Sequence, residues 1–289
     1  MSEKRDIDEL SGIETTGHEW DGIKELNNPL PRWWLWTFYG CIAVALVTSI
    51  VYPAWPLFGS ATPGLLHAST RSELNRDLAA AKTAQSANLD KIAAMPVAQI
   101  AADPELSRFA TAGGASFFKV YCTQCHGTGA EGGVGYPNLN DDEWLWGGSI
   151  DQIYTTITHG ARDPNDKDTH YNMMPNFGTE KLLTYEQIDT VAAYVASLSG
   201  LAGGANTPEG AKLFADNCAS CHGADGKGKA DRGAPDLSDQ IWLYRGSLSA
   251  IIAQITHPQH GTMPAWGPRL GDITVKELAV YVHGLGGGR

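Results

Sequence analysis

The chain has no excess of positive charge. Its 289 residues include 21 lysines and arginines against 32 aspartates and glutamates, which gives a formal net charge of −11. A protein that binds nucleic acid needs a basic face to offset the phosphates, so this balance argues against a nucleic-acid partner. An acidic surface instead favours a basic protein partner, which it attracts through long-range electrostatics.

One stretch lacks charge altogether, because no Asp, Glu, Lys or Arg occurs from Trp33 to Thr70. Its first twenty residues, WWLWTFYGCIAVALVTSIVY, would span about 30 Å as a helix, which is the thickness of the hydrocarbon core of a bilayer. Tryptophans stand at its front edge, and Tyr52 and Trp55 stand at its rear edge, as in aromatic belts. The sequence therefore predicts a single transmembrane anchor over residues 33–55, after an N-terminal segment of residues 1–32.

A cleaved signal peptide is the alternative, since Gly59-Ser60-Ala61 could serve as a cleavage site. The region before its apolar core would then be 32 residues long and carry eight acidic residues, unlike the short basic start of a signal peptide. For a retained anchor, Lys24 and Arg32 lie near the front edge, and Arg71 is the first basic residue behind it. This bias favours a cytoplasmic N-terminus.

The chain has few cysteines, and most of them are regularly spaced. Four of the five cysteines form two C-x-x-C pairs, and a histidine directly follows each pair: CTQCH at 122–126 and CASCH at 218–222. Cys41 lies inside the apolar stretch, where we expect it to be a small residue facing lipid or helix. Two matched pairs indicate one kind of site that the chain uses twice.

The similarity between the two halves extends beyond the cysteines. Residues 137–160 align with residues 235–258, and Met174-Pro175 aligns with Met263-Pro264. Each half ends in an amphipathic helical pattern. The sequence therefore predicts an all-α fold in which the anchor is followed by a helical linker at 56–104 and by tandem domains at 105–200 and 205–289.

Several kinds of site use a C-x-x-C pair. A structural zinc site needs four ligands in one place, whereas each pair with its histidine belongs to a separate repeat. A thioredoxin-like pair needs a βαβ setting, which the sequence does not indicate, and a disulfide framework does not need the histidines. In c-type haem attachment, both thiols form thioethers with the haem and the adjacent histidine ligates the iron. We therefore predict two covalently bound c-type haems, one at Cys122, Cys125 and His126 and one at Cys218, Cys221 and His222.

The sixth position of each haem iron needs another ligand, and Met174 and Met263 occupy equivalent positions in the two halves. Met173 is a rival to Met174, and the aligned His159 and His257 are rivals to both methionines. A methionine ligand raises the reduction potential and closes the iron to oxygen or peroxide, which is typical of an electron carrier.

Three other pairs of residues lie near the expected sites. We expect His170 and His260 to be solvated, because they have no common offset in the repeats. The aligned Trp144 and Trp242 are expected to pack against the haems, with donation of an indole N–H to a propionate as one possible role. Pro137 and Pro235 are expected to turn the chain beside the proximal histidines.

Residues 105–289 resemble class I cytochrome c domains through CTQCH, CASCH and the two Met-Pro pairs. Residues 18–56, HEWDGIKELNNPLPRWWLWTFYGCIAVALVTSIVYPAWP, resemble the N-terminal segment of the dihaem subunit (subunit III) of cbb3-type cytochrome c oxidases. Carried over by position, the resemblance assigns Met174 to the haem of Cys122, Cys125 and His126. It assigns Met263 to the haem of Cys218, Cys221 and His222.

The resemblance implies a subunit of the bacterial inner membrane with its haem domains in the periplasm, active in aerobic respiration. It would pass electrons from a soluble or membrane-bound cytochrome c toward a monohaem subunit and a proton-pumping haem–copper subunit. The only predicted span contains no histidine, so the oxygen-reducing centre must lie in a partner and the chain would not be an enzyme on its own. A free-standing membrane-anchored dihaem carrier and a dihaem peroxidase-like enzyme are the alternatives.

Overall fold

The computed structural model describes residues 6–286. The chain divides into two compact units, Met1–Ala84 and Gln85–Arg289, and we describe each by itself. The first unit contains β1 (Thr15–Trp20), β2 (Ile23–Leu26), α1 (Arg32–Val51), β3 (Pro56–Leu57) and β4 (Ser60–Ala61). The helix α2 (Thr70–Ala94) crosses the division at Ala84. The second unit contains α3 (Val97–Ala102), α4 (Pro104–Tyr121), α5 (Thr123–His126), α6 (Ile150–His159), α7 (Tyr185–Leu198), α8 (Pro208–Asn217), α9 (Ala219–His222), α10 (Leu248–Thr256), α11 (Gly267–Leu270) and α12 (Asp272–His283).

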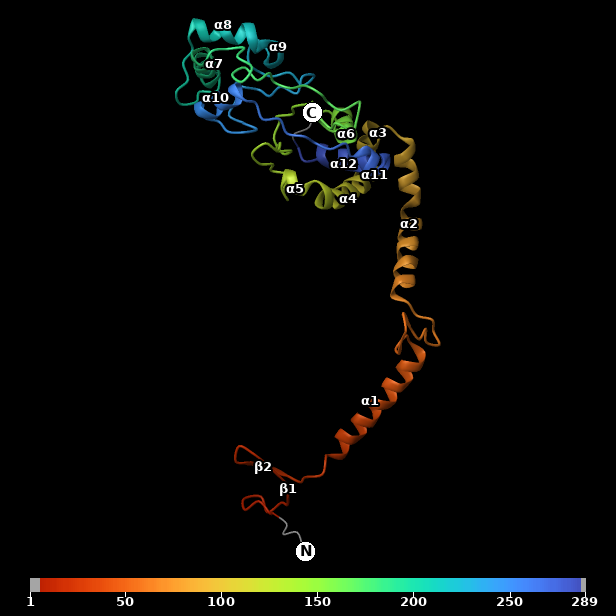
Figure 1. Cartoon of the computed structure of the whole chain (residues 1–289). Coiled ribbons are helices and arrows are strands. Elements are labelled where there is room, and N and C mark those ends of the chain that lie inside the picture. The colour runs from red at the N-terminus through yellow and green to blue at the C-terminus, as the bar shows by residue number, and fades with distance from the viewer. Residues whose placement is uncertain (1–5, 287–289) are drawn as a thin grey trace. The chain divides into compact units, whose positions relative to one another are not determined.

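The prediction of a mostly helical chain is confirmed, but the N-terminal unit also contains two short antiparallel hairpins (Figure 1). In the first hairpin, Trp20 of β1 pairs with Ile23 of β2, so only Asp21 and Gly22 form the turn. Both turn residues have positive φ, of 48° and 84°, and an Asp-Gly pair tolerates this conformation well. The predicted N-terminal segment therefore contains a structured hairpin at residues 15–26, which its sequence did not lead us to expect.

Helix α1 begins one residue before the predicted anchor and ends at Val51. It ends there because Tyr52 precedes Pro53 and adopts an extended conformation, with φ −108° and ψ 162°. In the described part of the chain it is the one helix long and apolar enough to cross a membrane, with a mean hydropathy of 1.8. None of its residues is buried, which suits a helix that faces lipid.

The second unit contains two hydrophobic clusters, and each of them combines helices from both repeats (Figure 1). Cluster A contains Phe118 of α4, Ile153 of α6 and Leu278 of α12, with Ile92 and Ile100 from α2 and α3. Cluster B joins α7 of the first repeat to α8 and α10 of the second. Clusters A and B therefore do not correspond to the predicted tandem domains of residues 105–200 and 205–289. Each cluster contains the C-terminal helix of the other repeat.

Equivalent contacts support this exchange. In cluster A the Phe118 ring of α4 lies 5.3 Å from the Tyr281 ring of α12. In cluster B the Phe214 ring of α8 lies 5.5 Å from the Tyr194 ring of α7. Each pair thus joins the N-terminal helix of one repeat to the C-terminal helix of the other.

The linker between the repeats explains the exchange. Residues 199–207 fold back on α7, because the amide of Leu201 donates to the carbonyl of Ala196 and the amide of Ala205 donates to that of Ala193, both at 2.9 Å. Thr207 then caps α8 by accepting a hydrogen bond from the amide of Gly210 at 3.0 Å. A turn this tight packs α8 against the preceding α7 as a helical hairpin. Helix α4 is left to pack with α12.

Candidate haem sites

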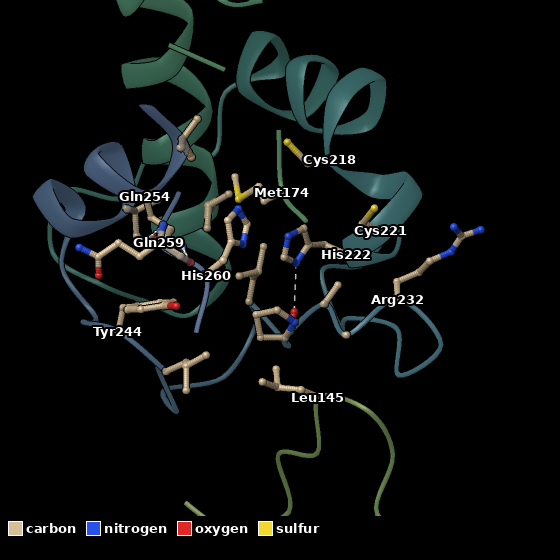
Figure 2. Close-up of a pocket in the computed structure, with 18 of the residues that line it drawn as sticks. Leu145, Met174, Cys218, Cys221, His222, Arg232, Tyr244, Gln254, Gln259 and His260 are labelled. Carbon is tan, nitrogen blue, oxygen red and sulfur yellow. Dashed lines mark hydrogen bonds between the residues drawn. The ribbon is translucent and has the colours of Figure 1, made fainter. Parts of the chain in front are cut away.

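Each C-x-x-C-H motif lines a large cavity. Pocket A contains Cys122, Cys125 and His126 and has an empty volume of about 1290 Å³ with its mouth included. Pocket B contains Cys218, Cys221 and His222 and has an empty volume of about 1330 Å³ (Figure 2). In both pockets the motif forms a single helical turn, α5 or α9, directly after the helix that precedes it.

In each motif histidine, one ring nitrogen forms a hydrogen bond with a backbone carbonyl. Nδ1 of His126 lies 2.9 Å from the carbonyl oxygen of Pro137, and Nδ1 of His222 lies 3.1 Å from that of Pro235. Because a carbonyl oxygen only accepts, Nδ1 carries the proton and donates it, which leaves Nε2 with a free lone pair. Burial lowers the pKa of both imidazoles, so the neutral form required of a ligand predominates. The two prolines thus orient the histidines as well as turning the chain.

The structure assigns the methionines to the opposite pockets from the sequence comparison. Met263 lines pocket A with Cys122, and Met174 lines pocket B with Cys218. The predicted pairings of Met174 with the first motif and of Met263 with the second are therefore wrong. The reason is the exchange of the C-terminal helices, which carries each Met-Pro segment into the other repeat.

Backbone hydrogen bonds hold each Met-Pro segment against the other repeat. Met263 and Ala161 exchange two hydrogen bonds of 2.9 Å, and the amide of Trp266 donates to the carbonyl of Ile157 in α6 at 3.0 Å. Gly160 allows this approach, since a Cβ at that position would lie 2.7 Å from the carbonyl carbon of Pro264. In the other half, the amide of Gly178 donates to the carbonyl of Thr256 in α10 at 3.3 Å. Helices α6 and α10 are equivalent in the repeat, so the two arrangements match.

A haem fits the polar groups of both pockets. The indole nitrogens of Trp144 and Trp242 are buried and have no hydrogen-bond partner among the described residues. Trp144 lines pocket A and Trp242 lines pocket B. A buried N–H without a partner is costly, and a haem propionate is an acceptor that would satisfy it. The matched pair of unpaired donors is the observation that fits a haem in each pocket.

The cysteines fit covalent attachment better than a zinc site. All four motif cysteines are free thiols, and burial raises the pKa of Cys122 and of Cys218 to about 11. Within the described residues, neither motif belongs to a group of three ligand atoms that could hold one metal ion. A tetrahedral zinc site needs convergent, deprotonated thiols, so the geometry does not favour one.

The rival ligands lie elsewhere. Met173 lines pocket B but is 49% exposed, whereas Met174 packs against cluster B. His159 lines neither pocket, and its Nδ1 lies 3.0 Å from the Asp166 carboxylate. His257 also lines neither pocket, and its Nδ1 is 3.4 Å from the Thr179 hydroxyl. Met174 and Met263 therefore remain the candidates for the sixth ligand.

The prediction that His170 and His260 are solvated is wrong. His170 stacks on Trp146 with ring centroids 4.5 Å apart and lies 3.1 Å from the Thr156 hydroxyl. His260 is half-buried in pocket B, where it lies beside Met174 and His222 (Figure 2). Both residues belong to the segments that cross between the repeats, where the repeats differ in sequence. Alignment of the repeats therefore could not predict that these two histidines would be partly buried.

Arg162 is a pocket residue that the sequence analysis did not single out. It is half-buried, has φ 58°, and lines both pockets. It follows directly on Ala161, the residue that pairs with Met263. Its side chain therefore lies at the crossing point of the two repeats.

An acidic cluster also joins the repeats. The carboxylates of Glu143, Asp236 and Asp239 lie within 4.8 Å of one another. Partial burial and the hydrogen bond and charge of Asp239 raise the pKa of Glu143 to about 7. The cluster is therefore only partly ionised near neutral pH.

The fold and the pockets define a protein of the cytochrome c class with two cytochrome c domains. Residues 110–199 match the family model described as cytochrome c, and residues 205–282 match the model for subunit III of cbb3-type cytochrome c oxidase. Residues 12–59 match the N-terminal domain of cbb3 cytochrome oxidase, FixP.

Full-length relatives agree with these matches. The chain is 56% identical to a cbb3-type cytochrome c oxidase subunit FixP of Sinorhizobium medicae over 290 residues, which cover 100% of both chains. It is 54% identical to a FixP subunit of Rhizobium meliloti with the same coverage. It is 51% identical to a cbb3-type subunit CcoP of Cereibacter sphaeroides over 95% of both chains. The chain belongs to the FixP/CcoP family of cbb3-type cytochrome c oxidase subunits and functions as a cytochrome c electron-transfer subunit.

Proposed function

We propose that the chain binds two covalent c-type haems and passes electrons from a periplasmic cytochrome c toward the catalytic subunit of a cbb3-type oxidase. The observation that carries the proposal is the matched pair of pockets, each with two free thiols, an oriented histidine, a methionine and an unpaired indole N–H. A c-type haem supplies an iron that takes up and gives back one electron without bond chemistry.

The ligand sets follow the crossed pockets. Cys122 and Cys125 would attach the first haem, and His126 and Met263 would ligate its iron. Cys218 and Cys221 would attach the second haem, and His222 and Met174 would ligate its iron. With two side-chain ligands on each iron, the haems would carry electrons and would not bind oxygen or peroxide. The peroxidase-like alternative requires an open or displaceable position and is disfavoured.

The prolines, tryptophans and apolar residues around each haem site would each have a separate role. Pro137 and Pro235 hold the imidazoles through their carbonyls, which leaves Nε2 free to ligate an iron. The indoles of Trp144 and Trp242 would donate to the propionates, and the apolar residues of clusters A and B would exclude water. A dry, rigid site changes little between oxidation states, which favours rapid electron transfer.

The anchor orients the chain. Lys24 and Arg32 on the N-terminal side of α1 favour a cytoplasmic N-terminus, and the haem domains would then lie in the periplasm of a bacterial inner membrane. The net charge of −11 suits a basic cytochrome c donor, whose binding should weaken as salt screens the attraction. The monohaem subunit and the haem–copper subunit would be the partners within the membrane.

Purification from membranes in mild detergent tests this proposal. We expect the chain to copurify with a polytopic subunit that carries b-type haem and copper, and to contain two c-type haems by pyridine-haemochrome analysis. Isolation of the chain alone from intact membranes, still loaded with two haems, would instead favour a free-standing dihaem carrier. Recovery without covalent haem would contradict the haem assignment itself.

A further inference from the structure

Within the described part of the chain, three residues line both pockets: Leu145, Arg162 and Leu243. Arg162 is the ionisable member of this set. Because it lines both pockets, its charge can act on a group bound in either of them. A leucine at the same place would provide packing alone.

The side chain of Arg162 holds the two segments that carry the methionines. Its Nε donates to the carbonyl oxygen of Gly261 at 2.6 Å, and Gly261 lies two residues before Met263. Its Nη1 donates to the carbonyl oxygen of Asn172 at 3.3 Å, and Asn172 lies two residues before Met174. One guanidinium therefore links the chain segments that present both candidate distal ligands.

The charge of Arg162 has no acidic partner within ion-pair distance among residues 6–286. The neighbouring Asp163 carboxylate instead accepts a hydrogen bond of 2.7 Å from the amide of Ala265, in the segment that follows Met263. Burial lowers the pKa of the Arg162 guanidinium, but a guanidinium stays charged at neutral pH. Two of its five N–H groups are used by the carbonyls, which leaves three for an anion in the pockets.

We propose that Arg162 is a positioning residue shared by both haem sites, which holds the two methionine segments and raises the reduction potentials of both haems together. The proposal rests on the haem assignment of the proposed function. A nearby fixed cation disfavours the oxidised, more positive iron, and the haem propionates are the anions that its remaining donors would bind. Loss of the charge would therefore lower both potentials, whereas an arginine that lines one pocket would affect one haem.

The test uses the whole purified complex with Arg162→Gln, Arg162→Lys and the control Arg232→Gln. Arg232 lines pocket B alone, and its side chain is 57% exposed. Haem content is measured first, because a wild-type chain without two c-type haems would refute the proposed function and not this inference alone. The two midpoint potentials are then measured by redox titration of the c-haem absorbance.

We expect Arg162→Gln to change the reduction equilibrium of both haems at least about tenfold toward the oxidised form, or about 59 mV each. Arg162→Lys keeps the charge but loses the planar fork, so it should lower both potentials by less. Arg232→Gln should affect at most one haem. If Arg162→Gln does not load haem, the joint shift is still expected in the lysine variant. A shift confined to one haem, no shift, or equal shifts in the Arg232 control would overturn the inference.

Discussion

A thioether and an imidazole stabilise the two oxidation states of a haem iron differently, so the two methionines can be tested one at a time. At the scale of single residues, Met174→His should lower the potential of the haem attached at Cys218, and Met263→His that of the haem attached at Cys122. We expect a shift of at least about 59 mV, a tenfold change in a one-electron equilibrium.

Second variants identify the affected haem. Trp242→Phe removes an unpaired donor from pocket B, and Trp144→Phe removes one from pocket A. When it is combined with Met174→His, Trp242→Phe should shift the same midpoint potential that Met174→His has already lowered. Trp144→Phe should shift the midpoint potential of the other haem. The reverse pattern would restore the pairing of Met174 with the first motif.

Glu277 gives the stability of the protein a pH dependence. This α12 side chain is only 4% exposed, and burial raises its pKa to about 7 from an ordinary 4.5. The folded state therefore binds more protons than the unfolded state between these values, so stability should fall as pH rises from about 4.5 to about 7. After allowance for solvent screening, the change should be roughly 1 to 2 kcal/mol.

Glu277→Gln should remove this slope and stabilise the protein above pH 7. Urea unfolding at several pH values measures the effect, with the exposed Glu186→Gln on α7 as a control for the loss of one negative charge. An unchanged slope in the Glu277 variant would show that this carboxyl ionises normally in the fold.

At the scale of helices, the close crossings depend on small residues. A Cβ at Gly114 of α4 would lie 2.7 Å from the Cβ of Tyr281, and one at Gly210 of α8 would lie 2.8 Å from the Cβ of Tyr194. Gly114→Val and Gly210→Val should each destabilise the protein by about 1 to 3 kcal/mol through overpacking. Gly133→Ala is the control, because nothing lies within 4 Å of its Cβ position.

The same variants distinguish the crossed packing from tandem domains. Gly114→Val should weaken haem retention in pocket A, and Gly210→Val should weaken it in pocket B, as measured by haem content after mild heating. The clashing atoms belong to the C-terminal helix of the other repeat, since the Cβ at Gly114 meets the backbone of Glu277 and the Cβ of Tyr281 in α12. Loss of haem from pocket B in Gly114→Val, with pocket A unaffected, would contradict the crossed packing.

How much the sequence could predict depends on how local each feature is. The haem-attachment motifs and the histidine–proline pairs lie within about fifteen residues and recur in both repeats, so a pattern reveals them. The partner of each Met-Pro segment depends on the turn at 199–207, and alignment of the repeats favours the wrong pairing. Arg162, His170 and His260 lie in crossing segments that the repeats do not share, so periodicity gave no sign of their roles.

At the scale of the molecule, the exchange means that neither repeat completes a pocket. A fragment of residues 105–200 retains Cys122 and His126 but lacks Met263 and α12. A fragment of residues 205–289 retains Cys218 and His222 but lacks Met174 and α7. Each fragment would also expose the apolar face that its missing helix covers, which favours aggregation.

We therefore expect a fragment that starts at Gln85, fused to an export signal, to be soluble and to hold both haems, since it contains the whole second unit. The two separate repeats, exported in the same way, should lose the far-red absorbance band typical of oxidised His/Met haem. Coexpression of the two repeats should restore this band, because the exchanged helices can then meet. A full band from either repeat alone would show that each methionine can serve its own motif, and that the crossing is not required for ligation.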